Sequence, residues 1–127
     1  MINTDNDKLA KTLKFVVLTQ QQDYAEVEAV ALEPFLNGVD IAHGGFLFSL
    51  CDYASALASN TEERIAISSG ASIDYIEPVL PNSEIVAIAQ KIAGNAKTGV
   101  YQVYITDNQT RAKRFVSFHS RVVYKNK

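Results

Sequence analysis

The 127-residue chain has a single cysteine, two histidines and no tryptophan. Because Cys51 is the single cysteine, no disulfide framework can form within the chain. One cysteine and two histidines are also too few to build a zinc knuckle. We therefore expect no metal site. A lone cysteine is typical of a reducing compartment, and we expect the protein to be cytoplasmic.

Long hydrophobic runs are also missing. No apolar stretch reaches membrane-spanning length, and the N-terminus "MINTDNDKLAKTLKF" lacks the continuous apolar core of a signal peptide. We expect no membrane partner. The net charge of -2 does not favour nucleic-acid binding. Basic residues gather in the C-terminal third, either as a solvated strand face or as a site for a small polyanion such as a nucleotide phosphate. Among them are Lys97, Arg111, Lys113, Arg114, Arg121 and Lys125.

Prolines and glycines are few, at three and six, and 47% of the residues are hydrophobic. This composition and length predict one globular domain over residues 1–127. Residues 1–14 are expected to carry a short surface helix, and the apolar run at 15–18 is either a strand or the end of that helix. In "DYAEVEAVAL", alanine and valine alternate with charged residues, which predicts a half-exposed strand.

The segment "AHGGFLFSLCDYASALASN", residues 42–60, follows a loop that contains a proline and an Asn-Gly pair. It is apolar on all sides, which is typical of a buried helix, yet it carries one carboxylate, Asp52. An ionised side chain inside such a helix costs free energy unless a neighbour satisfies it or a reaction uses it.

Four strand-like runs follow this helix, at residues 65–76, 84–92, 99–106 and 112–124. Short turns separate the last three, so we expect them to pair as an antiparallel meander. The predicted fold class is α+β, with an antiparallel sheet wrapped around one long central helix.

The stretches "NGVDIAHGGFLFSLCDYASALA", "SSGASIDYIEP" and "AKTGVYQVYI" resemble the hotdog-fold thioesterases, in the PaaI-like branch of the 4-hydroxybenzoyl-CoA thioesterase superfamily. The specific features are His-Gly-Gly, an aspartate nine positions after the histidine, and a Ser-Gly strand that ends in proline. The resemblance implies hydrolysis of an aryl or short- to medium-chain acyl-CoA to free acid and CoA. It further implies a homodimer, with a dimer of dimers expected, and no cofactor beyond the CoA of the substrate.

Gly44 and Asp52 are separated by about 12 Å along a helix, at ~1.5 Å per residue, so they cannot both reach one carbonyl within one chain. The resemblance implies that the Gly44 amide of one subunit polarises the acyl carbonyl while Asp52 of the other acts as general base or as nucleophile. Apolar surroundings should raise the pKa of Asp52. By the same resemblance, Asn37 positions the water and Ser68 lies near the carboxylate.

Substrate-binding residues also follow from the resemblance. His43 is expected to orient the loop before the helix, donating toward a backbone carbonyl, and Gly45 is expected to lie beside the substrate. Ser69 and Gly70 lie on a strand where the pantetheine arm would run close to the backbone.

Lys97, Thr98 and Gly99 match the lysine-threonine-glycine turn of the family. Lys97 with either Arg111 or Arg114 is the candidate set for the CoA phosphates, or else these are solubilising surface charges. One position departs from the family pattern, because relatives often carry arginine before the proline and this chain has a glutamate, Glu77.

Two other functions fit the same fold. A non-catalytic acyl-CoA sensor would be expected to lack the helix carboxylate, which is present here. A dehydratase would need a catalytic histidine paired with an acid, whereas His43 is better placed to orient its loop. His119 is expected to be a sheet residue, and Cys51 a small hydrophobic side chain with a raised pKa.

Overall fold

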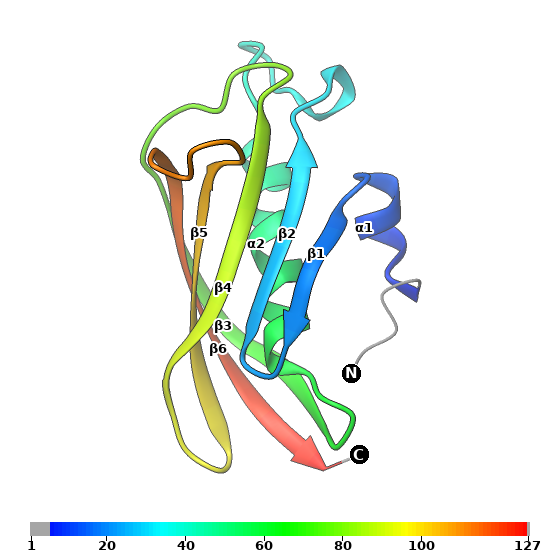
Figure 1. Cartoon of the computed structure of the whole chain (residues 1–127), viewed down its shortest axis with the longest axis vertical. Helices are drawn as coiled ribbons and strands as arrows, with labels where there is room; N and C mark the ends of the chain where they lie inside the picture. The colour runs from blue at the N-terminus through cyan, green and yellow to red at the C-terminus, as the bar shows by residue number, and fades with distance from the viewer. Residues whose placement is uncertain (1–5, 127) are drawn as a thin grey trace.

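The computed structural model describes residues 6–126, which form a six-stranded antiparallel sheet curled around one long helix, α2 (Gly44–Ser59) (Figure 1). The strand order is β1-β2-β4-β5-β6-β3. The strands are β1 (Val16–Gln21), β2 (Tyr24–Val30), β3 (Arg64–Tyr75), β4 (Glu84–Gly94), β5 (Thr98–Asp107) and β6 (Arg114–Asn126). The described residues also form two short helices, α1 (Lys8–Thr12) and the 3-10 helix η2 (Glu33–Phe35). The predicted α+β class is confirmed.

The N-terminal helix is shorter than the predicted range of 1–14, and residues 1–5 lie outside the described chain. It begins after Asp7, whose Oδ1 accepts a hydrogen bond from the Ala10 N–H at 2.9 Å. This cap satisfies one of the free amides of the first turn. Lys14 then adopts a positive φ of 62°, and the chain leaves the helix. Of the ambiguous run at 15–18, all but Phe15 belongs to a strand, β1.

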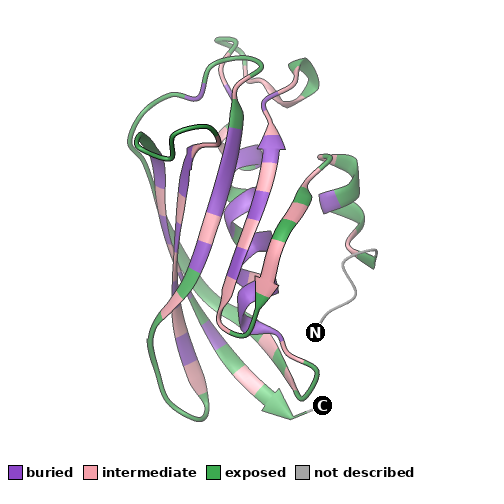
Figure 2. Cartoon of the chain, in the orientation of Figure 1, coloured by how far each residue is buried: buried purple, intermediate pink, exposed green. Residues whose placement is uncertain are grey.

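The faces of β2 follow the predicted alternation (Figure 2). Ala25, Val27 and Ala29 are buried against α2, and the acidic residues between them face away from it. In the neighbouring strand β4, Ala87 and Ala89 are buried on the same face. Because alternate residues of a strand share a face, these small side chains let the helix pack close to the sheet.

Helix α2 is not buried all round, so the expectation of a fully enclosed helix is wrong. One side packs on the sheet, with Leu50, Cys51 and Leu57 fully buried. Along the other side Phe48 and Asp52 are exposed. The carboxylate therefore lies at the surface of the single chain rather than in its core.

The meander of β4, β5 and β6 is confirmed by its antiparallel pairing. Strand β3 pairs with β6, so it forms one edge of the sheet, and β1 forms the other. The β3–β6 register shifts between Ser68 and Gly70. Ser69 is thereby the extra residue of a β-bulge, which reverses the faces of every β3 residue after it.

A polar cluster holds the C-terminal end of α2. Arg64 donates from Nε to the Ser59 carbonyl at 3.0 Å and from Nη2 to Asp23 at 2.6 Å, and its guanidinium lies 4.0 Å from the centre of the Tyr124 ring. Gly99 faces the same ring, since a Cβ there would overlap the Tyr124 hydroxyl. The absence of a side chain at Gly99 thus has a packing reason within the chain.

Candidate active site at the N-terminus of α2

The loop before α2 folds around Asn37. Its Oδ1 accepts hydrogen bonds from the N–H groups of Val39 and Ile41, at 3.0 and 3.3 Å, and its own N–H donates to the Ile41 carbonyl. Asparagine stabilises turns in this way by accepting from the backbone two or more residues ahead. The carbonyl oxygen of the amide is therefore used by the loop, and the Nδ2 group is what Asn37 has left for a ligand.

His43 caps the N-terminus of α2. Its ring Nδ1 accepts a hydrogen bond from the Gly45 N–H at 2.8 Å. The ring thereby supplies an acceptor for one of the free amides of the first helical turn. Donation from His43 to a backbone carbonyl stays a prediction, which would use the other ring nitrogen, Nε2. Within residues 6–126, the N–H of Gly44 has no acceptor.

Tyr75, the last residue of β3, lies over this first turn and was missed from the sequence. Its hydroxyl donates to the Gly44 carbonyl at 3.0 Å. A Cβ on Gly44 would lie 3.2 Å from both Cζ and the hydroxyl oxygen of Tyr75. The space beside Gly44 is thus filled on one side by this ring. Burial raises the pKa of Tyr75, which keeps the hydroxyl protonated as a donor.

A groove of about 380 Å³ opens beside these residues. Asn37, Gly44, Leu47, Tyr75 and Glu77 are among the residues that line it. The structure thereby brings together two predicted catalytic residues, Asn37 and Gly44, from the loop and the helix. An open helix N-terminus in such a groove suits a carbonyl oxygen that gains negative charge.

Asp52 does not line this groove. It lies two helical turns beyond Gly44, about 12 Å along the axis at ~1.5 Å per residue, and its side chain is exposed. No hydrogen bond or ion pair of the described residues reaches its carboxylate. Partial desolvation, and then the negative charge of Asp7, raise the pKa of Asp52 above its ordinary value, in the predicted direction.

Ser68 and its neighbours lie along the exposed edge strand. Ser68 is paired with the buried Val122, so its side chain is on the α2 side of the sheet. Ser69 donates from its hydroxyl to the Arg121 carbonyl at 3.2 Å. A side chain on Gly70 would meet no atom within 4 Å. These three residues stay predicted site residues, and none of them lines the groove at Gly44.

The predicted Lys97–Gly99 turn lies at the opposite end of the sheet from the N-terminus of α2 (Figure 1). There the Asn95 Oδ1 accepts from the N–H groups of Lys97 and Thr98, at 2.8 and 3.0 Å. Lys97 is exposed, whereas Gly99 is buried under Tyr124. Within one chain, this turn and the groove cannot contact the same part of a ligand.

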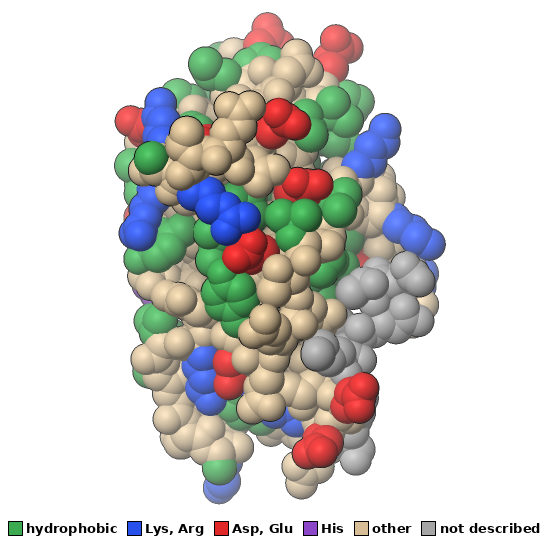
Figure 3. Space-filling view, in the orientation of Figure 1, with side chains coloured by type: hydrophobic (Ala, Val, Ile, Leu, Met, Phe, Trp, Pro, Cys, Tyr) green, Lys and Arg blue, Asp and Glu red, His purple; other side chains and the backbone are tan. Residues whose placement is uncertain are grey.

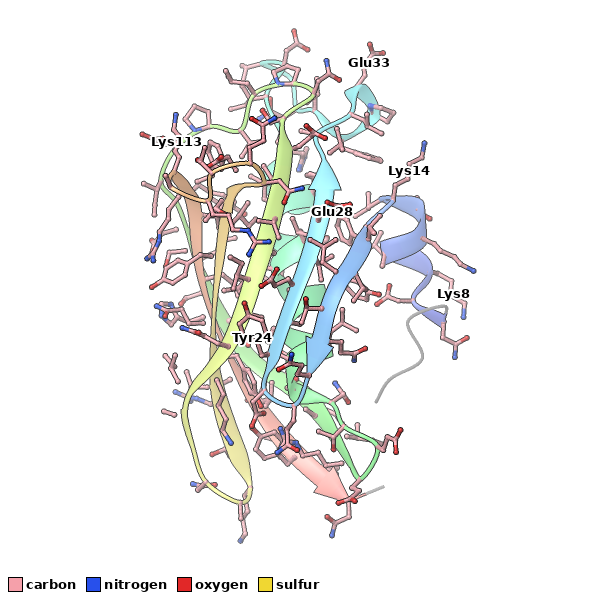
Figure 4. The ribbon with its side chains drawn as sticks, viewed as in Figure 1. Lys8, Lys14, Tyr24, Glu28, Glu33 and Lys113 are labelled. Carbon is pink, nitrogen blue, oxygen red and sulfur yellow. The ribbon has the colours of Figure 1, made fainter. Side chains whose placement is uncertain are left out.

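The two candidate arginines already have partners on the sheet face away from α2. Arg111 pairs with Glu26 at 2.8 Å, and Arg114 lies 3.7 Å from the centre of the Tyr104 ring. Acidic and basic side chains are interspersed on this face (Figure 3). Glu77, which departs from the family pattern, pairs with Lys113 at 3.0 Å. Figure 4 shows Lys113 at the same end of the molecule as Glu33, the end where the groove lies.

The remaining titratable candidates are structural. Burial, and then the charge of Asp52, raise the pKa of Cys51 well above its ordinary value, in the predicted direction, and the side chain is fully buried as expected of a small hydrophobic residue. His119 lies on β6 and its Nε2 contacts the Gln102 amide at 3.2 Å, as expected of a sheet residue. Residues 6–126 contain no cluster of metal-ligating side chains and no helix long and apolar enough to cross a membrane.

A curled antiparallel sheet around one helix, with a groove at that helix's N-terminus, defines a hotdog-fold protein. The model of the thioesterase superfamily matches residues 40–113. Acyl-coenzyme A thioesterase PaaI of Escherichia coli K12 is 34% identical over 107 residues, which cover 84% of this chain and 76% of the relative. The chain belongs to the thioesterase superfamily and is a PaaI-like member of it, a hydrolase that acts on thioester bonds.

Solved structures agree with this assignment. The structure of the E. coli PaaI protein from the phenylacetic acid degradation operon superposes with a TM-score of 0.88 at 32% identity, over 94% of this chain and 85% of that one. The TT0310 protein of Thermus thermophilus gives 0.86 at 30% identity, over 93% of this chain and 97% of that one. The hotdog fold predicted from the sequence is confirmed.

Proposed function

We propose that the protein hydrolyses an aryl or short- to medium-chain acyl-CoA, at a site that two copies of the chain build together. The Gly44 N–H of one copy polarises the acyl carbonyl, and Asp52 of the other activates the attacking group. The observation that carries the proposal is the division of the site within one chain: Asp52 is exposed outside the groove that holds the open Gly44 amide, and the carboxylate that lines this groove, Glu77, is already paired with Lys113.

In the general-base version, Asp52 takes a proton from a water as its oxygen attacks the thioester carbon. The carbonyl π electrons move onto oxygen, where the Gly44 N–H stabilises the negative charge. Collapse of this intermediate breaks the C–S bond, and the departing thiolate takes the proton from Asp52. In the nucleophilic version, an Asp52 oxygen attacks the thioester carbon, the C–S bond breaks and the CoA thiolate leaves. Water then hydrolyses the mixed anhydride, which frees the acid and the Asp52 carboxylate, and a proton of that water goes to the thiolate. Asn37 would hold the water through its Nδ2 group, and Ser68 would lie near the carboxylate.

The second copy is proposed to lie along β3 and the exposed side of α2. An edge strand presents unpaired backbone groups that another strand can extend. Beside this edge, exposed apolar residues lie on both faces: Phe48 on the α2 side, and Ile65 and Ile67 on the face of β3 away from α2. An antiparallel pairing of two β3 strands would bring the Asp52 side of one helix toward the groove of the other. The face away from α2 is the candidate surface for a dimer of dimers.

The CoA portion is proposed to run along Ser69 and Gly70, with the pantetheine arm close to the backbone. His43 and Gly45 keep their predicted place beside the substrate. The Lys97–Gly99 turn would contact the CoA phosphates from the partner chain, because it lies at the other end of its own sheet. Lys97 is the exposed charge of that turn, whereas both candidate arginines are already engaged by Glu26 and Tyr104.

The test is thiol release from acetyl-, hexanoyl- and phenylacetyl-CoA, with size measured by light scattering. Asp52→Asn should leave the assembly intact and reduce kcat by about 10³-fold or more, as removal of an activating group does. Glu62→Gln is the matched control, since it makes the same kind of substitution at an exposed loop residue. An Asp52→Asn enzyme with parental kcat would refute the role of the carboxylate, and an active monomer would refute the shared site.

The alternative is a non-catalytic acyl-CoA binding protein on the same fold. It predicts tight binding of acyl-CoA by the parent with no thiol release, and equal binding by Asp52→Asn. The exposed Asp52 carboxylate, which has no partner within residues 6–126, favours the enzyme, because a binding site for an anionic ligand gains nothing from a further negative charge beside it.

A further inference from the structure

The two glycines that open α2 are held by contacts from outside the helix. Glycine has more conformational freedom to lose than any other residue, so a Gly-Gly start is costly to hold in one conformation. The peptide unit between Gly44 and Gly45 is fixed at both ends. Its carbonyl accepts from the Tyr75 hydroxyl at 3.0 Å, and its N–H donates to the His43 Nδ1 at 2.8 Å.

The peptide unit before it is held only by its carbonyl. The His43 carbonyl accepts from the Leu47 N–H at 3.1 Å, while the Gly44 N–H of the same unit has no acceptor within residues 6–126. The direction of this free N–H therefore depends on the torsions at Gly44. Those torsions relate this unit to the clamped unit that follows, so the clamp fixes one side of the Gly44 hinge.

We infer that Tyr75 is a positioning residue for the Gly44 amide: its hydroxyl fixes the first peptide of α2, so that the adjoining N–H points to one place in the groove. This inference rests on the proposed function for the meaning of that amide. A misplacement of about 1 Å at a reacting group can cost on the order of 100-fold in rate. Restraint of the backbone at Gly44 should therefore affect kcat.

The ring of Tyr75 adds a steric restraint to the hydrogen bond. Its Cζ and hydroxyl oxygen approach the Cβ direction of Gly44 to 3.2 Å, which blocks rotation of Gly44 toward β3. Tyr75 itself comes from the end of a strand paired with β6, opposite the buried Val116. The helix start is thus tied to the sheet, and the groove wall and the amide move together.

The decisive variant is Tyr75→Phe, which keeps the ring and removes the hydroxyl. We expect kcat for the best acyl-CoA of the panel to fall about 10-fold with KM within about 2-fold, and thermal unfolding to be unchanged. Tyr24→Phe is the matched control, because it removes a hydroxyl bonded to Glu26 on the face away from α2. Parental kcat in Tyr75→Phe would overturn the inference, since packing alone is preserved there.

A second measurement needs no turnover. In the Asp52→Asn background, acyl-CoA labelled with ¹³C at the thioester carbonyl is bound and its infrared stretch is recorded. We expect Tyr75→Phe to reduce or broaden the downshift that the Gly44 N–H imposes on this band. An identical band with and without the hydroxyl overturns the inference even if the protein only binds acyl-CoA. If the parent protein releases no thiol, by contrast, the proposed hydrolysis is refuted, but the infrared measurement on bound acyl-CoA still tests the role of Tyr75.

Discussion

Substituting Gly44 by alanine probes the contact between α2 and Tyr75 directly. Alanine is favoured over glycine in a helix by up to ~1 kcal/mol. Against this gain, the new Cβ would lie 3.2 Å from two atoms of the Tyr75 side chain. Overpacking of this kind typically costs ~1–3 kcal/mol. We therefore expect Gly44→Ala to lower the free energy of unfolding by about 0–2 kcal/mol.

The sign should reverse when the ring is removed. In a Tyr75→Val background only the helix propensity remains, and valine is well accepted in a strand. There the alanine at position 44 should stabilise the protein by up to ~1 kcal/mol. The two substitutions should thus be coupled by about 1–3 kcal/mol, within the range seen for residues in contact.

The assay is urea unfolding of all four proteins at one protein concentration, since self-association would shift the midpoints. If the two changes add to within about 0.5 kcal/mol, they are independent, and the reasoning about Tyr75 is refuted. That result would mean that the ring swings aside, which its exposure of 51% allows but its hydrogen bond to Gly44 opposes.

Three further outcomes are expected. Asp7→Asn keeps the cap of α1, because asparagine caps as well as aspartate. It removes a charge that raises the pKa of Asp52, so the acid limb of the kcat/KM profile should move to lower pH. Asp52→Asn should raise stability at neutral pH, because the ionised carboxylate is disfavoured in the fold, and urea titrations should show the gain vanish below the ordinary value of 3.8. Gly99→Ala should cost about 3 kcal/mol in urea unfolding, because its Cβ would overlap the Tyr124 hydroxyl, and wild-type stability would contradict the packing role.

The elements that could be predicted are those specified by local pattern. Strand β2 alternates small apolar and charged residues, and helix α2 is a long apolar run bounded by a loop and turn residues. The place of β3 at the sheet edge could not be read in this way, because strand order depends on contacts between distant segments. The exposed side of α2 was missed for a related reason. An apolar helix side that is open in the single chain has the same composition as one that faces the core.

The site was predictable in part. Asn37 and Gly44 are close in sequence and joined by one loop, so their meeting in the groove follows from local structure. Tyr75 was not found because simple alternation along β3 from Ala66 puts it on the outer face. The bulge at Ser69 reverses that parity and turns Tyr75 toward α2. A bulge of this kind has no distinctive sequence here beyond the Ser-Gly pair.

The exposure of Asp52 changes what its raised pKa means. A carboxylate that is open to solvent on one side and carries no hydrogen bond within residues 6–126 does not stabilise the single chain. Its energetic cost is small while water covers it and grows if another chain covers it, because desolvation penalises the charged form. Dimerisation along β3 would therefore push the pKa of Asp52 further upward unless the partner supplies donors, and the groove side of the partner offers two, the Gly44 N–H and the Asn37 amide. Once substrate is bound, the Gly44 N–H goes to the acyl oxygen and the Asn37 amide is the donor left for the carboxylate, so the same contact that completes the site also tunes the pKa of its base.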